Sequence, residues 1–184
     1  MASVDECRSR AARLRLMAFD VDGVLTDGSL YFTDTGTELK AFNVRDGQGM
    51  RMLQSVGVTL AVITGRESGS VTWRARNLGI EHVRQGVGDK LAVFHNLIGE
   101  LGIDADQAGF MGDDIIDLRV MAACGFSAAP SDGHELARQQ ADYIATLPGG
   151  RGAVREVCEF ILAAQGKLNT ALAHYQPVTK AAFR

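Results

Sequence analysis

Residues 14–28 constrain the fold of this chain more than any other stretch. They begin with an apolar run that ends at Phe19, and two carboxylates, Asp20 and Asp22, follow directly before Gly23. The run has the length of one buried strand, and strand alternation would send both carboxylates to one face. Buried carboxylates are costly unless they are compensated. A divalent cation would compensate them and attract a phosphate; alternatively, both residues cap an Asx-turn, and this stretch alone leaves the two readings open.

Short apolar runs alternate with amphipathic segments along the rest of the chain. Strands are expected near residues 15–19, 58–63, 80–83, 108–111, 126–129 and 143–145. Helices are expected near residues 50–57, 68–78, 90–101, 115–123, 133–140 and 152–164. This order predicts an α/β sandwich with a mainly parallel sheet, whose ligands bind beyond the carboxyl ends of the strands. A chain of 184 residues is expected to form a single domain, residues 1–184.

Three segments stand outside this alternation. Residues 29–44 carry two aromatic, mostly apolar runs around a break with Asp and Gly, which predicts a β-hairpin. Placed directly after the first strand, it would be a flap over a site or an extension of the sheet. Residues 3–13 suggest a short polar helix or a frayed arm. The C-terminal tail, about residues 165–184, is weakly patterned and would be a mobile arm that crosses to a neighbouring copy, or disordered.

Composition excludes several classes of protein. A net charge of -3 and a pI near 5.8 give no support for a nucleic-acid surface. No apolar run reaches the roughly 20 residues that a membrane helix needs, and the polar N-terminus does not resemble a secretory signal. The three cysteines, Cys7, Cys124 and Cys158, are scattered without zinc-ligand spacing. We expect reduced thiols, with Cys124 and Cys158 buried, in a cytoplasmic protein that binds neither nucleic acid nor membrane.

Further polar side chains follow the ends of the expected parallel strands. Thr64 ends the run at 58–63, while Asp113 and Asp114 end the run at 108–111. Asp117 follows one helical turn later, and Lys90 begins the helix in between. Singly, each has a simple explanation: a helix cap, a strand-end hydroxyl, a solvated lysine. Because parallel strands end at one edge, together they predict a site for Mg²⁺ and a phosphate.

The expected geometry assigns roles within this site. Asp20, last on its strand, is the better-fixed nucleophile and would form an aspartyl-phosphate. Asp22 can act as general acid and then general base. Mg²⁺ would screen the nucleophile from the phosphate. Lys90 and the Thr64 hydroxyl, with the amides of residues 21–23 and Gly65, would hold the phosphoryl oxygens.

Four segments resemble the four motifs of the haloacid dehalogenase (HAD) superfamily, in order and across most of the chain. They are residues 20–27 (Asp-Val-Asp-Gly-Val-Leu-Thr-Asp), 64–66 (Thr-Gly-Arg), Lys90, and 112–117 (Gly-Asp-Asp-Ile-Ile-Asp). The resemblance implies a Rossmann-like core and an aspartyl-phosphate mechanism. It also implies Mg²⁺ held by the Asp20 side chain, the Asp22 backbone carbonyl and Asp113, with Asp114 and Asp117 in support. The second aspartate, Asp22, favours a phosphatase over a dehalogenase.

The spacing of the motifs leaves no room for a cap domain, which resembles the capless branch of the superfamily. Residues 27–28, 42–47, 63–66 and 149–156 closely resemble the phosphatases of 3-deoxy-D-manno-octulosonate 8-phosphate (Kdo 8-phosphate), which supply free Kdo for lipopolysaccharide. This resemblance implies a homotetramer in which the hairpin of one subunit and the C-terminal tail help close a neighbour's site. Arg45, Arg66 and Arg74 become candidates for gripping the sugar-acid carboxylate, beside Gly65.

Two alternatives stay open. The same chemistry could act on another sugar-acid phosphate, such as a nonulosonate 9-phosphate. The domain could instead be a non-catalytic assembly module of the same fold, although the presence of Asp20, Asp22, Thr64, Lys90 and Asp113 argues against loss of catalysis.

Overall fold

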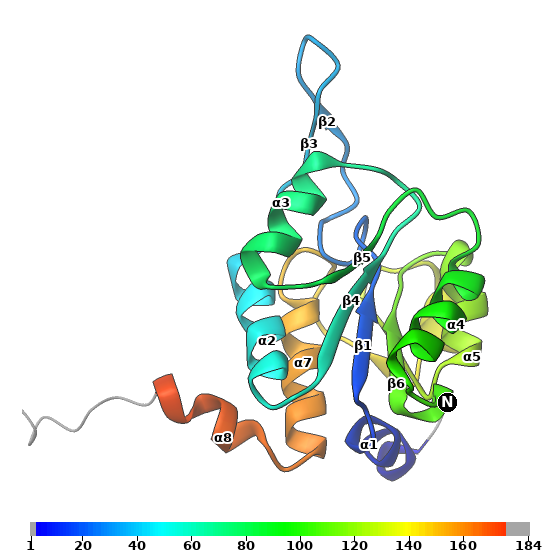
Figure 1. Ribbon diagram of the computed structural model, residues 1–184, viewed down its shortest axis with the longest axis vertical. Helices are drawn as coiled ribbons and strands as arrows, with labels where there is room; N and C mark the ends of the chain where they lie inside the picture. Colours follow the sequence, from blue (N-terminus) through cyan, green and yellow to red (C-terminus); the bar gives the residue numbers. More distant parts are fainter. Residues whose placement is uncertain (1–2, 176–184) are drawn as a thin grey trace, which may run out of the picture.

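Six strands form one parallel sheet in the computed structural model, which describes residues 3–175 (Figure 1). Their order is β5-β4-β1-β6-β7-β8, with β1 in the middle between β4 and β6. The strands are β1 (Leu16–Phe19), β4 (Thr59–Ile63), β5 (His82–Arg84), β6 (Ala108–Met111), β7 (Phe126–Ala129) and β8 (Tyr143–Ile144). The mainly parallel sheet predicted from the alternation is therefore confirmed.

Helices cover both faces of this sheet and complete a three-layer sandwich. One face carries α1 (Val4–Ala12), α2 (Val44–Ser55), α3 (Gly69–Leu78) and α7 (Ala153–Ala164). The other carries α4 (Lys90–Leu101), α5 (Leu118–Ala123) and α6 (Glu135–Gln140). Two short 3-10 helices flank β6 in the chain: η1 (Ala105–Gln107) lies between α4 and β6, and η2 (Ile115–Asp117) lies between β6 and α5. This is a Rossmann-like α/β fold.

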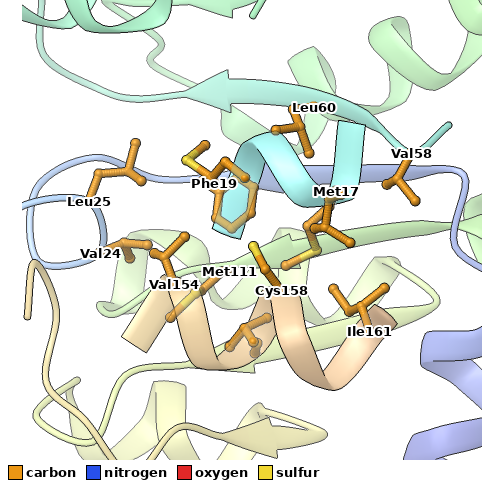
Figure 2. Close-up of a cluster of buried hydrophobic side chains, with 14 of the residues drawn as sticks. Met17, Phe19, Val24, Leu25, Val58, Leu60, Met111, Val154, Cys158 and Ile161 are labelled. Atoms are coloured by element: carbon orange, nitrogen blue, oxygen red, sulfur yellow. The ribbon is translucent and has the colours of Figure 1, made fainter. Parts of the chain in front are cut away.

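Strand β1 is buried on both faces, which explains its unbroken apolar run. Met17 and Phe19 pack into the core under α2 and α7, whereas Leu16 and Ala18 pack into the core under α4. Figure 2 shows Cys158 of α7 facing this strand. Burying a large apolar side chain contributes about 1.5–3 kcal/mol. Because Leu16 and Ala18 face α4, Asp20 comes next on the same side of the strand, and Lys90 lies there at the start of α4.

The predicted hairpin forms, but it is shorter than expected and separate from the main sheet. Its strands are β2 (Tyr31–Phe32) and β3 (Glu38–Leu39), and they project from the end of the molecule where the parallel strands finish (Figure 1). The alternative that it extends the sheet is therefore wrong. The second run does not continue as a strand to Val44, because the Asn43 side chain accepts from the Arg45 amide (2.8 Å) and caps α2 there.

Both ends of the described chain are helical. Ser3 caps α1, which buries Cys7 and Ala11, so the N-terminal segment is a docked helix and not a frayed arm. After α7 the chain forms α8 (Leu168–Leu172) and η3 (Ala173–Tyr175), and Ala171 is buried in the core. The Gln48 amide donates to the Tyr175 hydroxyl (2.6 Å), so the first part of the tail packs on its own chain. The rest of the predicted tail, residues 176–184, lies outside the described residues.

Two further features concern the described part of the chain. Among the helices of residues 3–175, none combines the length and the apolar character needed to cross a membrane. The three cysteines are free thiols, with Cys7 and Cys158 buried and Cys124 half-buried, so Cys124 is less buried than expected.

Candidate active site

The carboxyl ends of three adjacent strands, β4, β1 and β6, converge on one pocket of about 260 Å³. Its lining comes from the loops that follow these strands: Asp20, Asp22, Gly23, Gly28, Thr64, Gly65, Arg66, Asp113, Asp114 and Ile116. Seven of the predicted site residues line this pocket, and two others, Lys90 and Asp117, lie directly behind it against Asp20.

Asp20 forms a buried charge cluster with Lys90 and Asp117. The Lys90 Nζ lies 2.7 Å from Asp20 Oδ2 and 2.7 Å from Asp117 Oδ1. The other oxygen of Asp20, Oδ1, accepts from the Val21 amide (2.7 Å). Burial raises the pKa of Asp20 to about 6, the charge of Asp117 adds to this rise, and Lys90 opposes it. For Lys90, burial lowers the pKa, but the two carboxylates outweigh it and the net direction is upward.

Asp117 has both carboxylate oxygens engaged. Besides Lys90, it accepts from the amides of Asp113 (3.0 Å) and Asp114 (3.2 Å). Asp114 in turn caps η2, because its Oδ1 accepts from the Ile115 amide (2.7 Å). These contacts fix the loop after β6, which carries Asp113.

Asp113 offers the open ligand atom of the site. Within residues 3–175 its buried Oδ1 has no hydrogen-bond partner, and oxygens of Asp20, Asp113 and Asp117 lie within 4.8 Å of one another. Burial raises the pKa of Asp113 to about 8, and the charges of Asp20 and Asp117 add to this. Asp117 already accepts three hydrogen bonds, whereas Asp20 has two partners and Asp113 Oδ1 has none within the described residues, so Asp113 and Asp20 fit a hard divalent cation best.

Gly23 allows Asp113 to approach the first loop. A Cβ at this glycine would lie 2.0 Å from Asp113 Oδ2, and its φ of 84° is in the left-handed region. The loop around Gly23 is also held by residues 150–151, which lie far along the chain. The Gly150 amide donates to the Val24 carbonyl (2.9 Å), and Arg151 pairs with Asp27 (3.0 Å).

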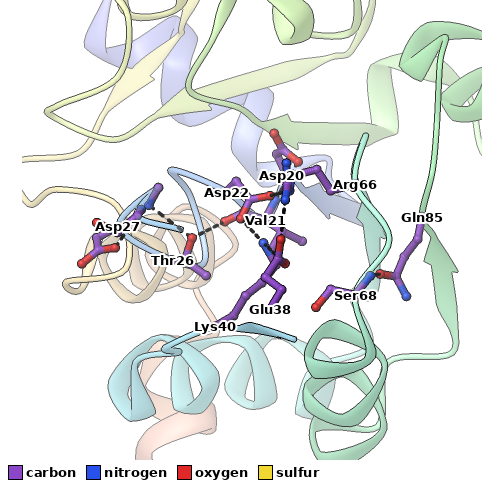
Figure 3. Close-up of polar contacts among 12 residues, drawn as sticks. Asp20, Val21, Asp22, Thr26, Asp27, Glu38, Lys40, Arg66, Ser68 and Gln85 are labelled. Atoms are coloured by element: carbon purple, nitrogen blue, oxygen red, sulfur yellow. Dashed lines mark hydrogen bonds and ion pairs between the residues drawn. The ribbon is translucent and has the colours of Figure 1, made fainter. Parts of the chain in front are cut away.

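Asp22 belongs to a second cluster, which it forms with the hairpin (Figure 3). Strand β1 ends at Phe19, so strand alternation does not extend to Asp22, which lies in a turn. Its Oδ1 forms an ion pair with Lys40, and its Oδ2 lies 3.8 Å from Arg66 Nε. Glu38 pairs with both cations, at 3.0 Å from Lys40 Nζ.

Sequence reasoning missed Glu38 and Lys40. One sequence feature pointed to them. Residues two apart on a strand share a face, so Glu38 and Lys40 are expected to point the same way where the hairpin returns to the body of the protein. The ion pair of Lys40 with Asp22 depends on how the hairpin bends over the site, which no local pattern encodes. The hydrogen bond from Arg66 and then the adjacent Lys40 ammonium lower the pKa of Glu38.

Thr64 and Gly65 lie where the sequence placed them, at the end of β4. Thr64 is buried, its amide donates to the Arg84 carbonyl (3.0 Å), and its carbonyl accepts from the Val87 amide (3.1 Å). Both main-chain groups of Thr64 are thereby fixed beside the pocket.

The structure does not bring Arg45 and Arg74 into this pocket. Arg74 donates to the Asn43 carbonyl (2.9 Å), lies over the Phe42 ring at 5.8 Å, and lines a neighbouring hollow with Lys40 and Trp73. Burial lowers the pKa of Arg74. Helix α2 begins at Val44, earlier than predicted, so Arg45 lies in its first turn. The Arg45 side chain is exposed there.

The parallel sheet and an aspartate-lined pocket, where the four motif segments meet, define a hydrolase of the HAD superfamily. The solved structure of a protein from Legionella pneumophila described as a HAD-superfamily (subfamily III A) hydrolase is 37% identical, with a TM-score of 0.90 over 93% of this chain and 94% of that one. The chain belongs to the family of the 3-deoxy-D-manno-octulosonate 8-phosphate phosphatases, as the following relatives show.

One relative is the 3-deoxy-D-manno-octulosonate 8-phosphate phosphatase KdsC of Yersinia pestis, 48% identical over 167 residues, which cover 91% of this chain and 89% of the relative. The solved structure of the Moraxella catarrhalis phosphatase of the same name contains magnesium, phosphate and Kdo. It is 44% identical, with a TM-score of 0.92, and the match covers 95% of this chain and 100% of that one. No protein-family model matches the chain.

Proposed function

We propose that this protein hydrolyses Kdo 8-phosphate to Kdo and inorganic phosphate. The observation that carries the proposal is the buried Asp20 carboxylate at the end of β1, held by Lys90 and lining a pocket with Asp113. The family relationship and the Kdo complex of the Moraxella catarrhalis relative support this substrate. A phosphatase of a nonulosonate 9-phosphate is the competing hypothesis; the family relationship argues against a non-catalytic assembly module.

Hydrolysis proceeds in two transfers. An Asp20 oxygen attacks phosphorus and forms an aspartyl-phosphate while the bond between phosphorus and the sugar O8 breaks; Asp22 gives its proton to O8. In the second transfer, Asp22 takes a proton from water as the water oxygen attacks phosphorus. The bond between phosphorus and Asp20 breaks, and inorganic phosphate and free Asp20 result.

Other residues of the chain hold the reacting groups. Lys90 keeps Asp20 in place, and the Thr64 hydroxyl with the Gly65 amide binds phosphoryl oxygens. Asp20 and Asp113, with the main-chain carbonyl of Asp22, would hold Mg²⁺. When bound, this ion screens the charge of the phosphate from that of its nucleophile.

Phosphate release with and without Mg²⁺ tests the proposal, using Kdo 8-phosphate, hexose phosphates and a nonulosonate 9-phosphate. We expect Mg²⁺-dependent release with Kdo 8-phosphate preferred. No turnover of any phosphate would refute the enzyme, and preference for the nonulosonate would refute only the substrate. Asp20→Asn should abolish turnover, whereas Asp104→Asn, at an exposed carboxylate, should not. A burst of product from folded Asp20→Asn protein would rule out Asp20 as nucleophile.

Arg66 is the proposed ligand of the substrate carboxylate, because it lines the pocket while Arg45 and Arg74 do not. Its guanidinium can bind a carboxylate through two parallel hydrogen bonds, which lysine cannot reproduce. Arg66→Lys should raise KM for Kdo 8-phosphate by on the order of tenfold, with a smaller change in kcat. Arg119→Lys, at an exposed arginine, is the control. An unchanged KM in Arg66→Lys would contradict this role.

A cytoplasmic location is proposed, which fits the free thiols. Cell fractionation tests the location, and recovery with the periplasmic fraction would contradict it.

A homotetramer is proposed as the working assembly. Four large apolar side chains of the hairpin region are about half exposed: Leu30, Tyr31, Phe32 and Leu39. Such a patch is typical of an interaction surface. A variant that combines Tyr31→Ser, Phe32→Ser and Leu39→Ser should be monomeric in light scattering. A variant that stays tetrameric would refute the role of the hairpin in assembly.

A further inference from the structure

The candidate nucleophile and the candidate proton donor are held in different ways. Asp20 accepts a main-chain hydrogen bond from Val21, and its supporting partner Asp117 accepts two more from the loop after β6. Asp22 is different: within residues 3–175, its carboxylate is held by side chains alone, those of Lys40 and Arg66. Its position therefore depends on residues outside the turn that carries it.

Of the two side chains that hold Asp22, Lys40 makes the closer and more buried contact. Its side chain is only 2% exposed, whereas that of Arg66 is 47% exposed and lies 3.8 Å from Asp22. A buried ammonium is costly unless it is paired. Lys40 is paired with Asp22 and, at 3.0 Å, with Glu38 of the same hairpin. Burial and two charged partners leave this side chain little freedom, which suits a group that fixes another.

We propose that Lys40 is a positioning residue for the general acid and base Asp22, a role that rests on the proposed function. Lys40 binds Asp22 Oδ1 and so fixes the rotation of the carboxyl group. Oδ2 is then the oxygen that gives its proton to the leaving sugar oxygen as the phosphorus–oxygen bond breaks. The same oxygen takes a proton from the attacking water in the second transfer. The hairpin thus completes the acid of its own chain's site (Figure 3).

The sensitivity of the rate to the leaving group tests this role. An alkyl phosphate such as Kdo 8-phosphate needs a proton on its leaving oxygen, whereas p-nitrophenyl phosphate releases a stable anion without one. A misplaced acid therefore slows the first substrate more than the second. If Lys40 instead bound substrate directly, its loss would raise KM, and if it only stabilised the fold, both substrates would be affected alike.

The experiment compares Lys40→Met with Lys167→Met, which removes an exposed ammonium distant from the site. Lys40→Met should lower kcat for Kdo 8-phosphate by on the order of a hundredfold, within the range for general acid catalysis, and lower that for p-nitrophenyl phosphate far less. Lys40→Arg keeps the charge and should recover at least about tenfold of the loss. Asp22→Asn should make the Lys40→Met change nearly silent, since both act through one group.

The outcomes separate this inference from the proposed function. Wild-type protein that turns over p-nitrophenyl phosphate but not Kdo 8-phosphate would overturn the proposed substrate, and the comparison then uses an alkyl phosphate that it accepts. Folded Lys40→Met protein with equal losses on both substrates, or with a change in KM alone, would overturn the positioning role. Additive effects of Asp22→Asn and Lys40→Met, or no recovery in folded Lys40→Arg protein, would overturn it as well.

Discussion

Replacing Gly23 by alanine should damage the metal site more than the fold. Two costs arise in this substitution. The φ of 84° is one that L-residues adopt at a cost of about 1–2 kcal/mol. In addition, the new Cβ would lie 2.0 Å from Asp113 Oδ2, a distance that forces the carboxylate to move. Asp113 is the proposed metal ligand with an open oxygen, so the second cost falls on Mg²⁺ binding.

The two costs have different magnitudes and different readouts. For a chain of this size, about 1–2 kcal/mol corresponds to a fall in Tm of roughly 2–8 °C. Disturbing the support of a metal ligand typically costs about 10- to 100-fold in metal affinity, and displacing the ligand itself should cost no less. We therefore expect Gly23→Ala protein that folds, binds Mg²⁺ at least about tenfold more weakly, and loses activity in proportion at limiting Mg²⁺.

Gly57→Ala separates the two costs. Gly57 has a φ of 91°, and apart from its two chain neighbours no described residue has an atom within 4 Å of its ideal Cβ, so this variant carries the backbone cost without the clash. Thermal unfolding of metal-free protein should place both variants close together, while Mg²⁺ titration by calorimetry should separate them. If Gly23→Ala bound Mg²⁺ as tightly as Gly57→Ala, the contact between Gly23 and Asp113 would not matter for the metal, and the reasoning would fail.

Three further tests concern the carboxylates of Asp20, Asp113 and Asp46. Lys90→Met leaves Asp20 and Asp117 uncompensated, so urea unfolding of metal-free protein should show a loss of about 3–5 kcal/mol at pH 8. Because the pKa of Asp20 is already raised to about 6, protonation relieves the repulsion and the loss should shrink at pH 5; equal losses at both pH values would contradict the cluster. The pKa of Asp113, about 8, means that below pH 8 a proton competes with Mg²⁺, so the Kd measured by calorimetry should rise by up to about tenfold per pH unit as the pH falls. Asp113→Asn should flatten this dependence, and an affinity that is constant from pH 6 to 8 would count against it. Asp46→Ala removes a buried acceptor of the Gly152 and Arg155 amides and should cost about 1–3 kcal/mol in chemical unfolding, unlike the surface change Asp104→Asn; a loss below the error of the fit would show that water replaces the acceptor.

The strands were predictable because burial on both faces leaves a continuous apolar run, as in β1 and β4. The start of α2 was not. Two glycines, Gly47 and Gly49, fall in its first turns, and glycine lowers helix propensity by about 1 kcal/mol each. The structure explains them by packing: a Cβ at Gly47 would lie 2.2 Å from the Arg74 guanidinium, and one at Gly49 2.9 Å from Arg155. Contacts with α3 and α7 thus override local propensity, which no pattern along the chain reveals.

The candidate site divides in the same way. Asp20, Thr64 and Asp113 could be brought together from the sequence, because each follows a parallel strand and such strands end at one edge. The contact between Asp22 and Lys40 could not, because Lys40 reaches Asp22 only through the bend of the hairpin over the sheet. The placement of the three arginines also required the structure, since only Arg66 follows a strand directly.

The two proposed catalytic carboxylates, Asp20 and Asp22, are held by different parts of the fold. The proposed nucleophile directly follows strand β1 and is held by the Val21 amide and the buried Lys90, so its geometry depends on the core of the fold. The proposed proton donor is fixed by side chains, chiefly from a projecting hairpin whose apolar residues are largely exposed. We therefore expect a contact that shifts the hairpin, in an assembly or with substrate, to affect proton transfer by Asp22 more than the position of Asp20. Regulation through the hairpin would appear first with substrates whose leaving oxygen needs a proton.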